Sequence, residues 1–144
     1  MMVVKELEKL LKKYRINVKN ALRHLKYSYK KVKKMSVNVH KLSEEQLETW
    51  ESFIARFSRM SDIFISKYLR THIQIKDPNF EGSVQDLLNQ AEKFGLIKSA
   101  KVWLEIRLAR NKASHDYDDE KLEESFREIR KLTPIVLNVE KKLS

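Results

Sequence analysis

The sequence predicts an all-α protein, an up-and-down bundle of four main helices with one short accessory helix. Apolar residues recur at three- and four-residue steps through most of the chain. The 144 residues include only two glycines and two prolines, too little turn chemistry for the many short strands of a sandwich or barrel. With 42% hydrophobic and 35% charged residues, the chain has enough apolar surface for a core, and we expect a single domain over residues 1–144.

The first half of the chain predicts two long helices. The first covers residues 4 to about 33, where an apolar stripe follows a helical repeat: Leu7, Leu10, Leu11, Tyr14, Val18, Leu22, Leu25, Tyr29 and Val32. The repeat is lost over residues 34–42. Ser43 with Gln46 has the spacing of a capping box, which predicts a second helix that continues to about Ile75. Short connections between such helices favour antiparallel packing.

The second half predicts a short helix and two longer ones. Asp77-Pro78-Asn79 breaks the repeat, and the short helix begins at Ser83 and ends at Gly95, a natural left-handed C-cap. A helix follows from about Ser99. The acidic run of residues 118–120 favours the start of the last helix. Pro134 should kink that helix or end it near Leu132, and we expect a kink.

The aromatic residues at helical spacing are expected in the core rather than as a platform for stacking bases; they are Trp50, Phe57, Phe64 and Trp103. The chain has no cysteine, which excludes disulfides, thiol nucleophiles and thiolate metal sites. His24, His40 and His72 stand alone, so we expect no metal site. Glycine-rich phosphate loops and serine nucleophile elbows are absent. No apolar stretch resembles a leader or a membrane span, so we expect a cytoplasmic protein with no membrane partner.

The positive charge is concentrated at the start of the chain. Residues 1–42 contain 13 Lys or Arg and two Glu, a net charge of +11, whereas residues 43–144 contain 17 basic and 18 acidic residues. A basic helix face attracts phosphate backbones, and it can equally be a solvated surface. The candidate RNA-binding residues are Lys12, Lys19, Arg23, Lys26 and Lys30.

The one dense cluster of chemically useful side chains lies at the end of the fourth predicted helix. It contains Arg110, Asn111, His115 and Tyr117. Histidine exchanges protons near neutral pH, and arginine is a permanent donor to phosphate. This pair suits RNA cleavage without a metal: His115 would act as general acid or base while a 2′-hydroxyl attacks its own phosphate, and Arg110 would stabilise the developing charge. Asn111 would orient His115 or hold the substrate.

The same residues have a structural explanation. His115 can cap helix carbonyls, Asp116 and Asp118 can cap the next helix, and Arg110 can pair with a nearby carboxylate. Residue types alone favour this explanation.

The motif resembles the HEPN superfamily, and more closely its branch of nucleotidyltransferase substrate-binding proteins, also described as toxins of MNT-HEPN pairs. Their pattern R-x4-H-x-Y is filled by Arg110, His115 and Tyr117. The frame from Ala91 through Gly95-Leu96-Ile97 and Trp103 agrees as well. Close relatives are expected to have acidic residues and a tryptophan where this chain has Ser58 and residues 65–67. This difference concerns the contacts with a partner and not the fold.

The resemblance implies a HEPN-like bundle that forms a homodimer with the Arg/His motifs facing a shared cleft. It implies the toxin of a type II toxin–antitoxin pair, a metal-independent endoribonuclease and hence a hydrolase. A cognate minimal nucleotidyltransferase, the antitoxin, would use ATP and Mg²⁺ to transfer AMP to Tyr117. This chain itself would need no cofactor. AMP on Tyr117 would block RNA phosphate by charge and volume.

Two other functions stay open. The older description of the branch implies a non-catalytic nucleotide- or substrate-binding subunit of a two-component nucleotidyltransferase. The charge asymmetry alone is compatible with a basic bundle that binds nucleic acid without chemistry.

Overall fold

The computed structural model describes residues 3–115 and 118–143, and the regular secondary structure in these residues is entirely helical, with no strand. The all-α prediction is therefore confirmed. The elements in chain order are α1 (Val4–Val32), η1 (Val39–Lys41), α2 (Glu44–Ile63), η2 (Phe64–Leu69), α3 (Arg70–Lys76), α4 (Val84–Lys93), α5 (Ala100–Ala113), α6 (Asp119–Leu137) and η3 (Asn138–Lys142).

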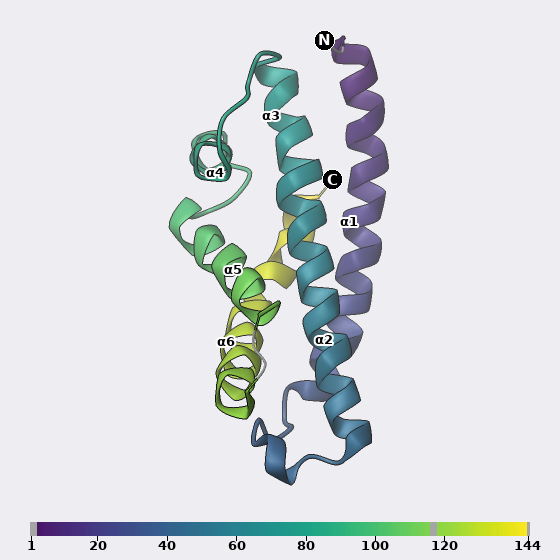
Figure 1. Ribbon diagram of the computed structural model, residues 1–144. Helices are drawn as coiled ribbons and strands as arrows, with labels where there is room; N and C mark the ends of the chain where they lie inside the picture. Colours follow the sequence, from purple (N-terminus) through teal and green to yellow (C-terminus); the bar gives the residue numbers. More distant parts are fainter. Residues whose placement is uncertain (1–2, 116–117, 144) are drawn as a thin grey trace.

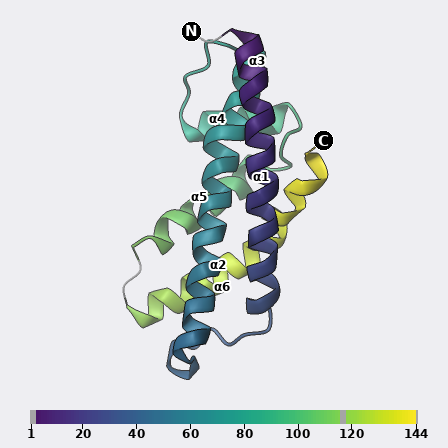
Figure 2. The same cartoon turned by 90° about the vertical axis from the view of Figure 1, so that its right-hand side faces the viewer.

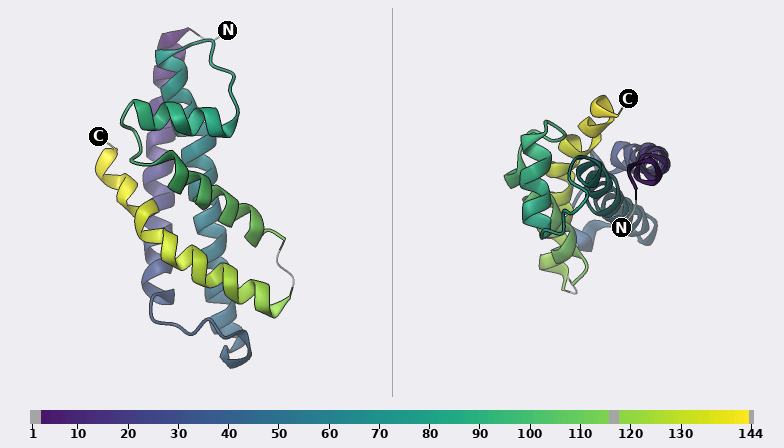
Figure 3. Two further views of the ribbon diagram at one scale, coloured as in Figure 1. Left: turned by 90° about the vertical axis from the view of Figure 1, so that its left-hand side faces the viewer. Right: turned by 90° about the horizontal axis from the view of Figure 1, so that it is seen from above.

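Two antiparallel pairs of helices make the bundle. α1 runs beside the continuous rod formed by α2, η2 and α3, and α5 and α6 form a second pair inclined across that rod (Figure 1). The view from above places α2 and α3 between α1 on one side and α4 and α5 on the other (Figure 3). α6 also packs on α1. The motif-bearing α5 is thus separated from α1 by α2.

The predicted helix ends are confirmed by their capping bonds. Ser43 Oγ accepts from the Gln46 amide at 3.1 Å, and Gln46 Oε1 accepts from the Ser43 amide at 2.9 Å. At the end of α4, Gly95 has φ +74°, and the Leu96 amide donates to the Ala91 carbonyl at 2.9 Å. This bond pattern is a Schellman cap, which requires a left-handed residue and so favours glycine.

One local feature differs from the predicted elements, and one open alternative is decided. Residues 64–69 form a π-helical turn within the second rod, which an apolar repeat cannot reveal. α6 continues through Pro134 to Leu137, so the helix does not end near Leu132. The kink expected at Pro134 stays a prediction.

The core is continuous and aromatic. Trp50, Phe57 and Phe64 are at most 1% exposed and Trp103 is 3% exposed, which confirms the prediction for all four. The Trp50 ring stacks on the Phe126 ring of α6 with centroids 4.6 Å apart and an interplanar angle of 4°. Burial of such side chains supplies most of the stabilisation of a helical bundle.

Arg130 joins α6 to the end of α1. Its Nη1 donates to the carbonyl of Val32 at 3.0 Å and to that of Met35 at 2.7 Å, and its guanidinium lies 5.2 Å from the Trp50 ring centroid. The last carbonyls of a helix have no partner within the helix. Arg130 therefore adds a side-chain donor at the end of α1, where the Val32 carbonyl also accepts from the Met35 amide at 3.0 Å.

His72 in α3 is a partly buried titratable group, and we expect it to make stability depend on pH. Burial lowers the pKa of His72 below its usual 6.5, and the positive charges of Lys76 and Arg15 lower it further, against a backbone hydrogen bond that raises it. The Nδ1 atom of His72 and the Nε atom of Arg15 are buried without a hydrogen-bond partner. Charging the imidazole is therefore less favourable in the folded chain than in the unfolded chain.

We expect the free energy of unfolding to fall as the pH drops below 6.5, because the unfolded chain then binds a proton that the folded chain resists. His72→Gln stays neutral and should lose this part of the pH dependence. Urea unfolding of both proteins between neutral and mildly acidic pH measures the effect. An identical decline in wild type and variant would show that His72 does not cause it.

Candidate functional site

The motif lies at the C-terminal end of α5. α5 ends at Ala113, Ser114 is its C-cap, and the His115 amide donates to the Lys112 carbonyl at 3.0 Å in the turn that follows. Arg110 and Lys112 are in the last helical turn, where the helix dipole favours positive charge. His115 therefore lies just beyond the helix and not on its regular surface.

A bidentate ion pair fixes Arg110 against α2. Its Nε donates to Asp62 Oδ1 at 3.0 Å, and its Nη2 donates to Asp62 Oδ2 at 2.9 Å. The remaining Nη1 donates to Ser114 Oγ at 2.6 Å. The hydrogen bonds that Arg110 donates to Asp62 raise the pKa of Arg110 further above its already high value, so Arg110 is permanently charged and locally neutralised.

His115 is exposed. No hydrogen bond or ion pair joins its side chain to any described residue. Asn111 is also exposed, and the expected contact between Asn111 and His115 is not present among the described residues. The predicted modification site Tyr117, and Asp116 before it, lie outside the described residues.

The turn from α5 to α6 is anchored on both sides. Asp118 Oδ1 accepts from the Lys121 amide at 2.8 Å and caps α6, and Lys112 Nζ lies 3.3 Å from Glu124 Oε2. Two features of the structural explanation are thus confirmed: Arg110 pairs with a carboxylate, and Asp118 caps the next helix.

A groove opens next to this turn, between α2 and the facing ends of α5 and α6. It has a volume of about 390 Å³ and is lined by Glu51, Ile54, Ala55, Ser58, Ala113, Ser114, Leu122 and Phe126. Pockets that hold small molecules have volumes of roughly 300–1,000 Å³ and combine apolar walls with a few polar groups. Ser114 belongs both to this groove and to the Arg110 contact, so the ion pair borders the groove.

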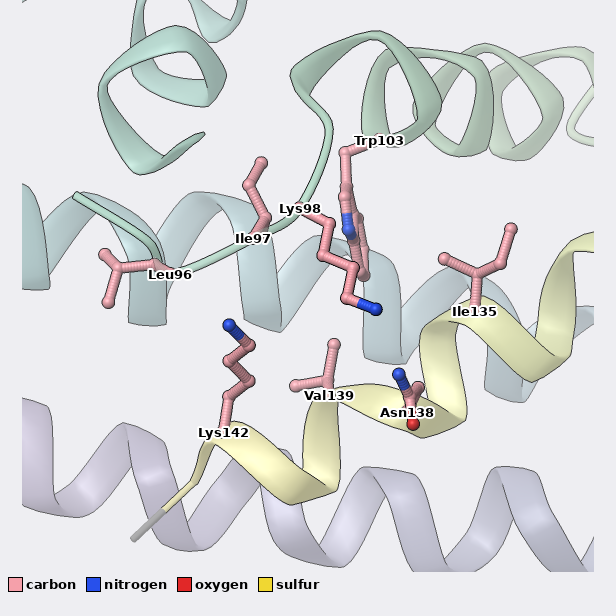
Figure 4. Close-up of a pocket in the computed structure, with 8 residues that line it drawn as sticks. All are labelled: Leu96, Ile97, Lys98, Trp103, Ile135, Asn138, Val139 and Lys142. Carbon is pink, nitrogen blue, oxygen red and sulfur yellow. The ribbon is translucent and has the colours of Figure 1, made fainter. Parts of the chain in front are cut away.

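A second, smaller pocket lies at the other end of α5. Its volume is about 60 Å³, and Trp103 and Val139 form part of its apolar lining (Figure 4). Lys142 Nζ at its rim donates to the Gly95 carbonyl at 3.2 Å. A water molecule occupies about 30 Å³ in the liquid, so this pocket is too small for a nucleotide.

The candidate RNA-binding residues are exposed on α1 and lie away from the motif: Lys12, Lys19, Arg23, Lys26 and Lys30. Because α2 separates α1 from α5 (Figures 1 and 3), these cations lie on another side of the bundle from the end of α5. Both Arg110 and His115 are at that end, but among the described residues Arg110 binds Asp62 and Ser114 and makes no bond to His115. Their role in RNA binding stays a prediction.

Asp62 is the member of the site that sequence reasoning missed. It is a lone carboxylate between the apolar residues of the second predicted helix, in Met60-Ser61-Asp62-Ile63-Phe64. An acidic residue on a helix face that is otherwise apolar becomes partly buried and then needs a partner. This position among apolar residues is the one feature of the sequence that points to Asp62. Its partner lies 48 residues away.

Two kinds of site are not found in the part of the chain that the structure describes. Residues 3–115 and 118–143 contain no group of three or more His, Cys, Asp or Glu arranged to hold a metal ion. In the same residues, every helix is too short or too polar to cross a membrane.

Comparison with known proteins identifies a family for this chain. A search of curated proteins gives no significant match. Residues 8–144 match the family model described as nucleotidyltransferase substrate binding protein like. The matched region includes α5, the Arg110–Asp62 pair and the groove beside it, and extends over nearly the whole chain. The chain therefore belongs to the nucleotidyltransferase substrate binding protein-like family.

Proposed function

We propose that this chain is the non-catalytic substrate- or nucleotide-binding subunit of a two-component nucleotidyltransferase. The observation that carries the proposal is the family match over residues 8–144. A partner enzyme would supply the transfer chemistry with ATP and Mg²⁺, and this chain would hold the acceptor or the nucleotide. The binding subunit then needs a pocket and a partner surface, and no catalytic group of its own.

The groove beside the motif supports this assignment. Its size is that of small-molecule sites. Leu122 and Phe126 supply apolar surface, and Glu51, Ser58 and Ser114 supply polar groups that can orient a ligand. The groove is open to solvent along the ends of two helices, so a bound acceptor would stay accessible to a second protein.

The ion pair between Arg110 and Asp62 also supports a binding subunit over a ribonuclease. An RNA phosphate at Arg110 would compete with the bidentate Asp62 carboxylate for the same donors. In the single chain, Arg110 holds the end of α5 against α2 and positions Ser114 at the groove. This is a structural task, and it leaves Arg110 poorly suited to attract a phosphate.

A second candidate is the HEPN toxin, a metal-independent endoribonuclease. It is favoured by the exposed His115 five residues after Arg110. In this reaction His115 would remove or return the proton while the ribose 2′-hydroxyl attacks its phosphate. Arg110 would have to leave Asp62 to stabilise the charge, and a homodimer would supply a second motif. The partner would silence the toxin by transferring AMP to Tyr117.

Incubation of the purified chain with total RNA in chelator separates the two functions. As a binding subunit, the chain should leave RNA intact. His115→Ala should behave in the same way, and His40→Ala is the matched control because His40 is also an exposed histidine. Mass spectrometry must first show that Tyr117 is unmodified. Fragments with 2′,3′-cyclic phosphate ends, lost only in His115→Ala, would replace the binding subunit with the ribonuclease.

A further inference from the structure

One face of α1 carries an unbroken stripe of exposed side chains. Its members follow each other at steps of three or four residues, so they lie above one another along the helix. Every one of them is exposed: Lys5, Lys9, Lys12, Ile16, Lys19, Arg23, Tyr27 and Lys30. We call this set the α1 stripe. At 1.5 Å per residue it is about 38 Å long.

The α1 stripe points away from the core. The buried residues of α1, among them Leu11, Val18 and Leu25, are on the opposite side of the helix wheel. Figure 2 looks onto this outer face, with α1 in front of the rest of the bundle. None of the six cations of the stripe forms an ion pair with a described carboxylate. Their charge is therefore available to a partner.

The two uncharged members of the stripe are large apolar side chains held in solvent. Ile16 and Tyr27 are each 59% exposed. Near Tyr27 two further cations gather, with Lys31 Nζ at 4.7 Å and the Arg56 guanidinium carbon at 5.8 Å from the ring centroid. An exposed aromatic ring amid cations suits a ligand that has both a flat face and negative charge.

A polar groove lies beside Tyr27, between α1 and α2. It has a volume of about 140 Å³, and its lining includes the hydroxyl groups of Ser28, Thr49 and Ser52, the cations Lys31 and Arg56, and one carboxylate, Glu48. Arg56 is fixed there, because its Nη1 donates to Ser28 Oγ at 2.9 Å and to the His24 carbonyl at 3.2 Å. The cation is thus positioned in advance, with donors left for an anion.

We propose that the α1 stripe, with the groove at Tyr27, is a binding surface for single-stranded nucleic acid. The backbone phosphates run along the lysines and Arg23, and one base stacks on the Tyr27 ring. Binding releases counterions from the strand, and stacking on an aromatic ring tolerates any base. The surface gives affinity with little sequence preference.

A membrane surface fits the stripe less well. Helices that lie on membranes insert a wide apolar face between the lipids, and the apolar face of α1 is buried against α2 and α6. The stripe is on α1, which α2 separates from α5 (Figures 1 and 3), and His115 directly follows the end of α5. The inference therefore does not depend on the proposed function, and binding should survive His115→Ala.

The test uses fluorescence anisotropy with a labelled oligouridylate long enough to follow the whole stripe, at increasing NaCl concentration. The triple variant Lys19→Gln/Arg23→Gln/Lys30→Gln removes three of the proposed contacts between the stripe and the backbone phosphates. The salt slope of the binding constant should fall by about 2, since each contact with a single strand contributes about 0.7. Tyr27→Ala should weaken binding about five- to hundredfold, because stacking is lost, and should leave the salt slope unchanged.

The control removes the same charge from exposed positions on other helices, as Lys93→Gln/Lys101→Gln/Lys131→Gln. It should bind like wild type. Equal losses in both triple variants would overturn the proposal, because binding would then follow net charge alone. Failure to bind at low salt would overturn it, as would a duplex bound as tightly as the single strand with no effect of Tyr27→Ala. Retention on phosphatidylserine vesicles but not on the oligonucleotide would assign the stripe to a membrane.

Discussion

Trp50→Ala is expected to lower the free energy of unfolding by about 3–5 kcal/mol, the usual cost of truncating a buried aromatic residue. Trp50 is fully buried. It stacks on Phe126 and meets the edge of the Phe53 ring at a centroid distance of 5.8 Å. Its Nε1 also donates to the Ser36 carbonyl at 3.0 Å, so the truncation loosens α2, α6 and the linker after α1 together.

Two further variants complete this test: one separates the contribution of packing from that of the hydrogen bond, and the other is a control at an exposed aromatic residue. Trp50→Phe keeps an aromatic ring and loses the bond to the Ser36 carbonyl, so it should cost less than the alanine variant. Tyr27→Ala removes an exposed ring and should change stability by no more than about 0.5 kcal/mol. Urea unfolding followed by circular dichroism gives all three values. A loss below about 1 kcal/mol for Trp50→Ala would mean that the core does not pack as described.

Filling the groove beside Ser114 should strongly impair the function of a binding subunit. Ala55 lines the groove and is exposed, so Ala55→Trp can place an indole in the groove without disturbing the core. Nucleotide transfer by the partner to its acceptor should fall by at least about tenfold, since a loss of 1.4 kcal/mol in acceptor binding is a factor of ten.

The matched control for the filled groove is Asn89→Trp, which adds the same indole at an exposed position of α4. With this variant, nucleotide transfer by the partner should proceed at the wild-type rate. The variant should also unfold at the same urea concentration as Ala55→Trp. Normal transfer by Ala55→Trp would show that the acceptor binds elsewhere.

The helices and their ends were predictable because their signals are local. A repeat of three and four residues fixes which face of α1 is buried, and Ser43 with Gln46 encodes the start of α2 within four residues. Gly95 encodes a stop, because the cap needs a left-handed residue. The π-helical turn at residues 64–69 leaves the apolar repeat nearly unchanged, so it has no comparable signal.

The candidate site was predictable only in part. The spacing of Arg110 and His115 predicts a candidate site at the end of α5. The partner of Arg110, however, depends on how α5 packs on α2, and Asp62 is far away in sequence. The groove has the same origin, since its walls come from α2, α5 and α6. Such features arise from tertiary packing, and local propensity carries no information about them.

The position of the transferred nucleotide tests the central claim most directly. A nucleotidyltransferase that copurifies with this chain is incubated with α-phosphate-labelled ATP, Mg²⁺ and a cell extract, with and without the chain. A binding subunit predicts label on an acceptor other than this chain, and only when both proteins are present. Label on the chain itself, lost in Tyr117→Phe, would contradict that claim and identify the chain as the target of its partner.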